Sequence, residues 1–168
     1  MRGGSGDGMS GPSAGQAGPS ADGPRHASFL GLSRRGFHRI AYTEWGDPTA
    51  ARVAVCVHGL TRQGRDFDRL AAALARKGWR VACPDLVGRG RSGWLRDPEE
   101  YALPQYCVDM AALVARLGAE AVDWVGTSLG GLVGMVLAGQ EGSPIRRLVV
   151  NDIGPHLPWS ALQRIASQ

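Results

Sequence analysis

The chain has 168 residues, of which 43% are hydrophobic and 20% are charged, and its formal net charge is +4. This composition is ordinary for one globular domain with a sizeable core. The arginines stand singly or in pairs instead of forming a stripe with interleaved aromatic residues, which argues against a nucleic-acid partner. No apolar run approaches the roughly 20 residues that cross a bilayer, and the N-terminus lacks the apolar centre of a secretory signal. We therefore expect no membrane partner and a cytoplasmic location.

The N-terminal segment differs in composition from the rest of the chain. Gly, Ser, Ala and Pro dominate it, and it contains almost no large apolar side chains. Such a segment cannot bury enough surface to offset the entropy cost of ordering it. We expect a disordered leader over residues 1–28, a partial core domain over residues 29–158, and the start of a truncated helix or lid over residues 159–168.

Apolar periodicity, glycine and proline divide the remaining chain into alternating strands and helices. In chain order we expect a strand over Phe37–Trp45, a strand over Arg52–Val57, a helix over Asp66–Lys77, a strand over Trp79–Cys83, a helix opened by Pro104 and closed by Gly118, a strand over Ala121–Val125, a helix over Leu129–Gln140 and a strand over Ile145–Asn151. Short connections between alternating elements predict an α/β fold, with a doubly wound, mostly parallel sheet flanked by helices.

The three cysteines are too few and too widely spaced for a disulfide framework or a zinc site. Cys56 and Cys83 fall in strand-like runs, and Cys107 falls on the apolar face of the helix that Pro104 opens. That face also contains Met110, Ala111, Val114 and Leu117. We expect buried thiols in a reducing compartment and no bound metal.

The most informative stretch is Gly126-Thr127-Ser128-Leu129-Gly130, which follows one expected strand and opens a helix. We call residues 126–130 the elbow. Gly126 and Gly130 allow the strand and the helix to pass without side-chain clashes, and the tight turn exposes the Ser128 hydroxyl at the positive end of the helix. A glycine-rich segment alone would be weak evidence, but the flanking strand and helix make this pattern specific.

Two further motifs precede the elbow in a fixed order. His58-Gly59 follows the second expected strand, and Asp85-Leu86-Val87-Gly88-Arg89-Gly90-Arg91-Ser92 follows the third. With the elbow, this ordered set resembles the α/β-hydrolase fold family, in particular its single-domain esterase-like branch, over roughly residues 37–158. The resemblance implies that the chain corresponds to the N-terminal portion of such an enzyme.

The resemblance implies roles for individual residues. Ser128 takes the position of the nucleophile, and the backbone N–H groups of Leu129 and Leu60 take the positions of the oxyanion-hole donors. His58 and Gly59 shape the oxyanion loop, and His58 precedes the serine instead of following it, so we do not expect it to be the base. Asp85, with Gly88 and Gly90, is expected to shape the neighbouring loop.

In this family the catalytic acid and the histidine follow the serine. We expect the chain to end before the strands that carry them, so that the fragment lacks its general base and is inactive alone. Asp152, which ends the last expected strand, is a candidate acid, although a solvated loop carboxylate is the simpler interpretation. A self-contained triad of Ser128, Asp152 and His156 would place two members on one short loop, which makes it a minor alternative.

The expected function is hydrolysis of a carboxylic ester or a related acyl bond of a small molecule, without metal or organic cofactor. Carbon–carbon bond hydrolysis, acyl transfer and haloperoxidation on the same fold remain alternatives, as does a non-catalytic truncated product or interaction module. A serine at the elbow argues against the dehalogenase and epoxide-hydrolase branches. The strand Ile145–Asn151 would leave an exposed edge, from which we expect self-association.

The sequence predicts the surroundings of four other polar residues less specifically. His26 and His38 have no neighbouring chemistry in the sequence, so we expect them at the surface. Arg62 and Arg65 follow the oxyanion loop and could either contact an acidic group of a substrate or be solvated.

Overall fold

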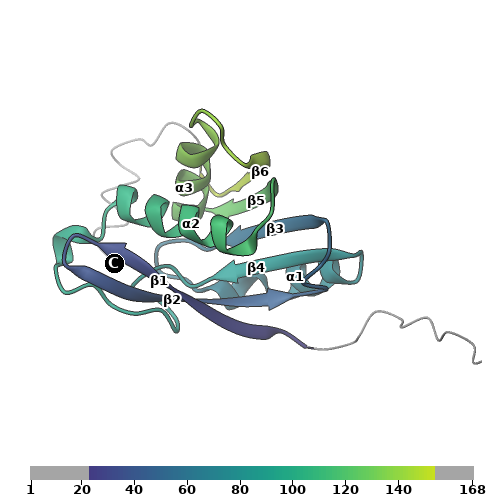
Figure 1. Cartoon of the computed structure of the whole chain (residues 1–168), viewed down its shortest axis with the longest axis horizontal. Helices are drawn as coiled ribbons and strands as arrows, with labels where there is room; N and C mark the ends of the chain where they lie inside the picture. The colour runs from purple at the N-terminus through teal and green to yellow at the C-terminus, as the bar shows by residue number, and fades with distance from the viewer. Residues whose placement is uncertain (1–22, 154–168) are drawn as a thin grey trace, which may run out of the picture.

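The computed structural model describes residues 23–153, in which six strands form a single sheet in the order β1-β2-β4-β3-β5-β6 (Figure 1). The strands are β1 (Arg25–Ser33), β2 (Gly36–Trp45), β3 (Arg52–Val57), β4 (Trp79–Pro84), β5 (Val122–Thr127) and β6 (Ile145–Asn151). The helices are α1 (Asp68–Ala75), α2 (Leu103–Leu117) and α3 (Leu129–Ala138), with short 3-10 turns η1 (Gly64–Phe67) and η2 (Pro98–Glu100).

The sheet is parallel at its centre and antiparallel at one side. β3 pairs in parallel with β4 and β5, and β5 pairs in parallel with β6. β2 pairs antiparallel with both β1 and β4. Helices cover both faces, with α2 and α3 on one face and α1 on the other (Figure 1). The predicted α/β class, with a mostly parallel sheet flanked by helices, is confirmed.

The central strand β3 shows why the sheet needs helices on both faces. Val53, Val55 and Val57 belong to the larger core beneath α2 and α3. Ala54 and Cys56 alternate with them and belong to the smaller core beneath α1. A strand that is buried on both faces has a continuous apolar sequence instead of an alternating one. All three cysteines are buried free thiols, as expected.

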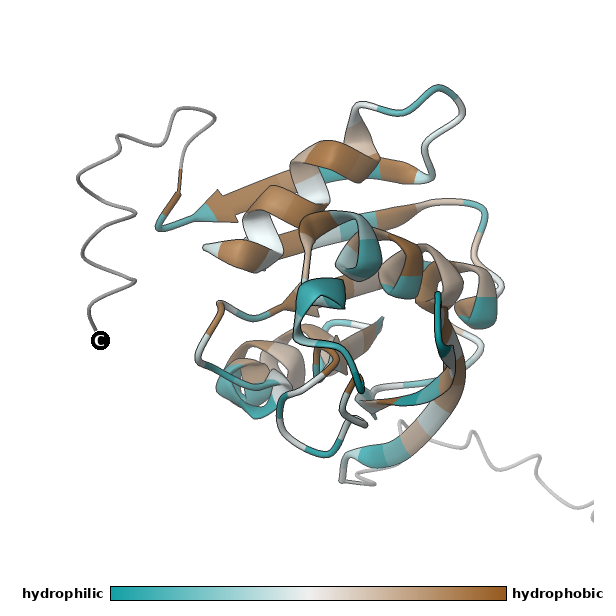
Figure 2. Ribbon diagram, turned by 90° about the vertical axis from the view of Figure 1, so that its left-hand side faces the viewer, coloured by the Kyte–Doolittle hydropathy of each residue, from teal (hydrophilic) through white to brown (hydrophobic). Residues whose placement is uncertain are grey.

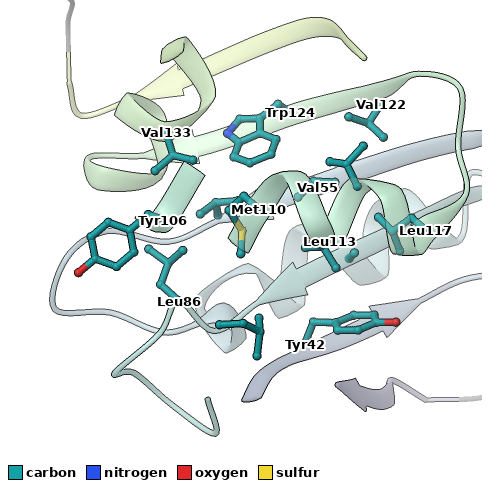
Figure 3. Packing of buried hydrophobic residues seen from close by; sticks show 14 of the residues in the cluster. Tyr42, Val55, Leu86, Tyr106, Met110, Leu113, Leu117, Val122, Trp124 and Val133 are labelled. Carbon is teal, nitrogen blue, oxygen red and sulfur yellow. The ribbon is translucent and has the colours of Figure 1, made fainter. Parts of the chain in front are cut away.

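The larger core is organised around Trp124 of β5, whose side chain is fully buried. Figure 3 shows its indole ring among Val133 of α3, Met110 of α2 and Val55 of β3. The indole Nε1–H donates to the Gly130 carbonyl oxygen at 3.0 Å. A side chain at Gly134 would overlap the indole ring. The core therefore packs directly against the first turn of α3, which begins at the elbow.

The hairpin of β1 and β2 is the main departure from the expected elements. β1 begins at Arg25, inside the segment expected to be a leader, and it pairs with β2 from Arg25↔Glu44 to Ser33↔Gly36. Phe29 packs against the larger core, but Leu30 and Leu32 are exposed. The inward-facing positions of β1 include Gly31 and the outward-facing ones include two leucines, so the apolar residues of this strand do not alternate in the sequence. Residues 1–22 lie outside the described part of the chain, as do residues 154–168.

The other strands lie where the sequence predicts them, within one or two residues at either end. The expected helix over Asp66–Lys77 is a 3-10 turn followed by the shorter helix α1. α2 has Pro104 in its first turn and ends at Gly118 with φ +65°, as expected. Its buried face includes Leu113 instead of Ala111, which is exposed.

β6 is the last strand of the described sheet on its side, and Figure 2 shows the predominantly hydrophobic colour of β6 and α3. Val149 of β6 is exposed. Self-association through this edge stays a prediction. None of the helices within residues 23–153 combines the length and the hydropathy required of a membrane span.

The role of Trp124 can be tested by comparison with Trp94, whose side chain is 75% exposed. We expect Trp124→Ala to lower the free energy of unfolding by about 3–5 kcal/mol, because it leaves a large cavity and removes the hydrogen bond to Gly130. Trp94→Ala is expected to change it by only about 0.5 kcal/mol. Urea denaturation of both variants checks this, and similar losses in the two would contradict the packing described here.

Candidate active site

Ser128 lies between the end of β5 and the first residue of α3. Its backbone has φ +49° and ψ −114°, a conformation that residues with a side chain rarely adopt. The Ser128 hydroxyl does not cap the helix, although the residue occupies the N-cap position. The backbone N–H of Ser128 donates to the Asn151 carbonyl oxygen of β6 at 2.9 Å. The strained conformation therefore does not serve helix capping, which is the ordinary structural use of a serine here.

The two outer glycines of the elbow are required by close backbone contacts. A Cβ atom at Gly126 would overlap the backbone of Gly130, and a Cβ atom at Gly130 would overlap the Val57 carbonyl oxygen at the end of β3. Both contacts are with backbone atoms, which cannot move away at low free-energy cost as a flexible side chain could. The elbow is therefore packed against the end of the neighbouring strand β3, from which the next loop begins.

The loop after β3 is organised by His58, which is buried. Its Nε2 accepts the Leu86 N–H at 2.9 Å, so the proton is on Nδ1, which donates to the Gly59 carbonyl oxygen at 2.7 Å. Burial lowers the pKa of His58, and the hydrogen bond to Gly59 offsets this only partly. Both ring nitrogens are thus occupied by backbone groups, which leaves no free lone pair for a general base.

Gly59 and Leu60 bring this loop next to the elbow. A Cβ atom at Gly59 would lie 3.4 Å from the Ser128 Cβ, so the loop passes directly beside the serine. The Leu60 carbonyl oxygen accepts from Arg89 Nε at 2.9 Å, and the Leu60 side chain is exposed. Leu129, the first residue of α3, packs its side chain partly into the larger core. The N–H groups of Leu60 and Leu129 are not used as donors within the described part of the chain.

The loop after β4 is held by Asp85, which is buried. One carboxylate oxygen accepts the Gly64 N–H at 2.8 Å, and the other accepts the Arg91 N–H at 2.9 Å. Gly90 has φ +50°, and its missing side chain leaves room for the Asp85 carboxylate. Ser92 donates to the Asp85 carbonyl oxygen and accepts the Ala41 N–H. These contacts support the role of a loop-shaping carboxylate for Asp85.

Asp152 follows β6, whose residue Asn151 pairs with Thr127 beside the elbow. Its side chain is exposed and its φ is +57°. Asp152 therefore lies at the same edge of the sheet as Ser128, but it contacts no histidine within residues 23–153. His156, the other member of the minor alternative triad, lies outside the described residues.

The structure places two histidines and shows the ion-pair partners of two arginines. His26 is exposed, as expected, but the expectation for His38 is wrong: it is buried, and its Nε2 contacts both Asp109 carboxylate oxygens at 2.9 Å. Burial raises the pKa of Asp109, against the influence of His38. Arg62 pairs with Asp66, and Arg65 pairs with Asp68, so both arginines already have carboxylate partners.

Arg89, which contacts Leu60, lies within the motif after β4, but that motif predicted a role only for Asp85, Gly88 and Gly90. Residues 23–153 also contain no group of three or more His, Cys, Asp or Glu side chains placed to hold a metal ion.

The sheet topology, the elbow and the two loops beside it define the α/β-hydrolase class. The sequence model of the family described as alpha/beta hydrolase fold matches residues 53–168, and the chain belongs to this family.

Several relatives carry the names of hydrolases, lipases or esterases. A 3-hydroxybutyrate-oligomer hydrolase of Cupriavidus necator is 56% identical over 144 residues, which cover 86% of this chain and 49% of that protein. Lipase LipV of Mycobacterium tuberculosis is 34% identical over a segment that covers 72% of this chain and 44% of that protein. The crystal structure of an alpha/beta hydrolase from Novosphingobium aromaticivorans matches with a TM-score of 0.76 at 39% identity. The match covers 86% of this chain and 49% of that one. The chain thus spans about half the length of the relatives it matches.

The contact between Gly130 and Val57 predicts that the elbow cannot accept a methyl group. We expect Gly130→Ala to lower the free energy of unfolding by about 3 kcal/mol or more, because the backbone of β3 or α3 must shift. Gly139→Ala is the matched control, since Gly139 has φ −78° and room for a Cβ atom. Its expected effect is within about 1 kcal/mol. Equal stabilities of the two variants in urea denaturation would refute the close packing.

The state of His58 predicts a pH dependence of stability. Its pKa in the folded state is lowered, so folding favours the neutral ring. The contribution of neutral His58 to the free energy of unfolding is therefore complete above the unfolded-state pKa of about 6.5 and is lost as the pH falls below it. We expect the free energy of unfolding to fall between about pH 7.5 and pH 5.5, and to fall less in His58→Gln. An unchanged slope in His58→Gln would show that the histidine is not buried in its neutral form.

Proposed function

We propose that the protein to which this chain belongs is a serine esterase with Ser128 as its nucleophile. The observation that carries this proposal is the backbone of Ser128, which is held at φ +49° at a strand-to-helix turn without capping the helix. Strained backbone conformations cluster at functional sites, because packing must maintain them. The close contacts of Gly126 and Gly130 supply that packing.

The chemistry follows from the groups around this serine. The Ser128 Oγ attacks the ester carbonyl carbon, its proton passes to a histidine, and the alcohol leaves with that proton. Water then cleaves the acyl-enzyme bond and releases the carboxylic acid. The N–H groups of Leu60 and Leu129 stabilise the negative charge on the carbonyl oxygen in the tetrahedral intermediates.

The base is proposed to lie outside residues 23–153. Within them His58 is fully hydrogen-bonded, His38 is buried against Asp109, and His26 belongs to the β1 hairpin. Asp152 remains the candidate acid, because it lies at the same edge of the sheet as Ser128. The relatives are about twice as long as the matched segment, which leaves length for a histidine loop.

For the substrate we propose short oligomers of 3-hydroxybutyrate or a similar hydroxy acid. The support is the relative named a 3-hydroxybutyrate-oligomer hydrolase, whose 56% identity exceeds that of the lipase, at 34%. Each linkage in such an oligomer is a carboxylic ester, which matches the proposed chemistry.

We expect Ser128→Ala, in the protein expressed from its natural gene, to lower kcat for the 3-hydroxybutyrate dimer by at least about 10⁴-fold. The reason is that no other group replaces the nucleophile. Release of the monomeric acid measures the rate, and Ser143→Ala, on the loop between α3 and β6, serves as the control with near-normal activity.

Retained activity in Ser128→Ala would contradict the proposed nucleophile. Preferential hydrolysis of long-chain glycerides would contradict the proposed substrate but not the serine mechanism. Absence of any esterase activity in the wild type would favour one of the other chemistries of this fold or a non-catalytic role.

A further inference from the structure

The loop after β4 contacts the loop after β3 at two points. Leu86 N–H donates to His58, and Arg89 Nε–H donates to the Leu60 carbonyl oxygen, each at 2.9 Å. The second contact reaches the residue whose N–H is a proposed oxyanion donor. A hydrogen bond with a charged donor is shorter and stronger than one between neutral groups.

The Arg89 guanidinium is itself held on several sides. Its Nη1 donates to the Val87 carbonyl oxygen at 2.8 Å and to the Tyr106 hydroxyl at 2.7 Å. Its Cζ lies 5.4 Å from the centroid of the Tyr106 ring and 5.9 Å from that of Tyr101. Tyr106 is buried beside Leu86 in the larger core (Figure 3). The planar group is thus fixed before any substrate binds, which is the condition for it to orient a neighbour.

The peptide group between Gly59 and Leu60 is also fixed, through its carbonyl oxygen. The Gly59 carbonyl oxygen accepts from His58 Nδ1 at 2.7 Å and from the Arg62 N–H at 3.2 Å. Because a trans peptide is planar, fixing this oxygen directs the Leu60 N–H the opposite way. The hydrogen bond from Arg89 then fixes the next carbonyl group along the chain. The donor at Leu60 therefore has an anchored carbonyl on each side.

We propose that Arg89 is a positioning residue that holds the Leu60 N–H in the orientation required by the oxyanion. This proposal rests on the proposed esterase function. The Leu60 N–H stabilises negative charge that develops on the substrate oxygen only in the transition state. A less ordered Leu60 N–H should therefore lower kcat more than it raises KM.

The test compares Arg89→Met with Arg91→Met in the protein expressed from its natural gene. Arg91 belongs to the same loop, but its guanidinium contacts His26 and Thr43 instead of Leu60. Removing a whole oxyanion donor costs about 10²–10³-fold in kcat, so we expect Arg89→Met to lower kcat by about 10–100-fold with KM changed less than about threefold. Arg91→Met should leave both values near those of the wild type.

Two further measurements separate positioning from general stability. Hydrogen exchange of the backbone over residues 58–62 should accelerate in Arg89→Met and not in Arg91→Met. Added guanidinium ion should partly restore kcat in Arg89→Ala, because it can donate to the same carbonyl. If Arg89→Met does not fold, Tyr106→Phe removes one anchor of Arg89 while retaining the ring, and the same kcat-selective loss is expected at about threefold to tenfold.

Normal kcat and unchanged exchange in folded Arg89→Met would overturn the proposal. So would equal losses in kcat and stability for the two arginine variants. Failure of the proposed function is distinguishable, since the wild type would then lack esterase activity, or Ser128→Ala would retain it, whatever Arg89 does.

Discussion

The structure depends on the close approach of three backbone segments at one edge of the sheet. Gly126 lies near the end of β5, Gly130 lies in the first turn of α3, and the Val57 carbonyl oxygen at the end of β3 lies against Gly130. Only glycine fits at both positions of the elbow, and the serine between them has a positive φ. The hydrogen bond from the Trp124 indole to the Gly130 carbonyl links this packing to the larger core. Core stability and the presentation of Ser128 are therefore parts of one arrangement.

The two loops beside the elbow extend the same arrangement through polar contacts. His58 and Arg89 each join the loop after β3 to the loop after β4, and Asp85 holds the latter through two backbone N–H groups. A buried polar side chain is retained at low cost only when its hydrogen-bonding groups are satisfied. His58 meets this condition with both ring nitrogens, which favours a structural role over a catalytic one for this histidine.

The sequence predicted most of the fold and the elbow, because strong signals specify them. The apolar runs of β3 and β5 and the glycines at positions 126 and 130 are local signals of this kind. β1 was not predicted, since its order comes from pairing with β2 and not from its own composition. The burial of His38 had a signal that was overlooked: it alternates with Ile40 and Tyr42 on the core-facing side of β2. Arg89 lies in the motif after β4, but its contact with Leu60 could not be predicted, because the two residues are distant in the sequence.

We propose that Ser128 is an activated nucleophile held by the elbow. The most direct measurement is mass spectrometry of the protein expressed from its natural gene after reaction with a fluorophosphonate, an ester-like reagent that modifies activated serines. We expect one adduct per chain, located on the peptide that contains Ser128, with loss of esterase activity in proportion to labelling. An adduct on another residue, or loss of activity without modification of Ser128, would contradict it.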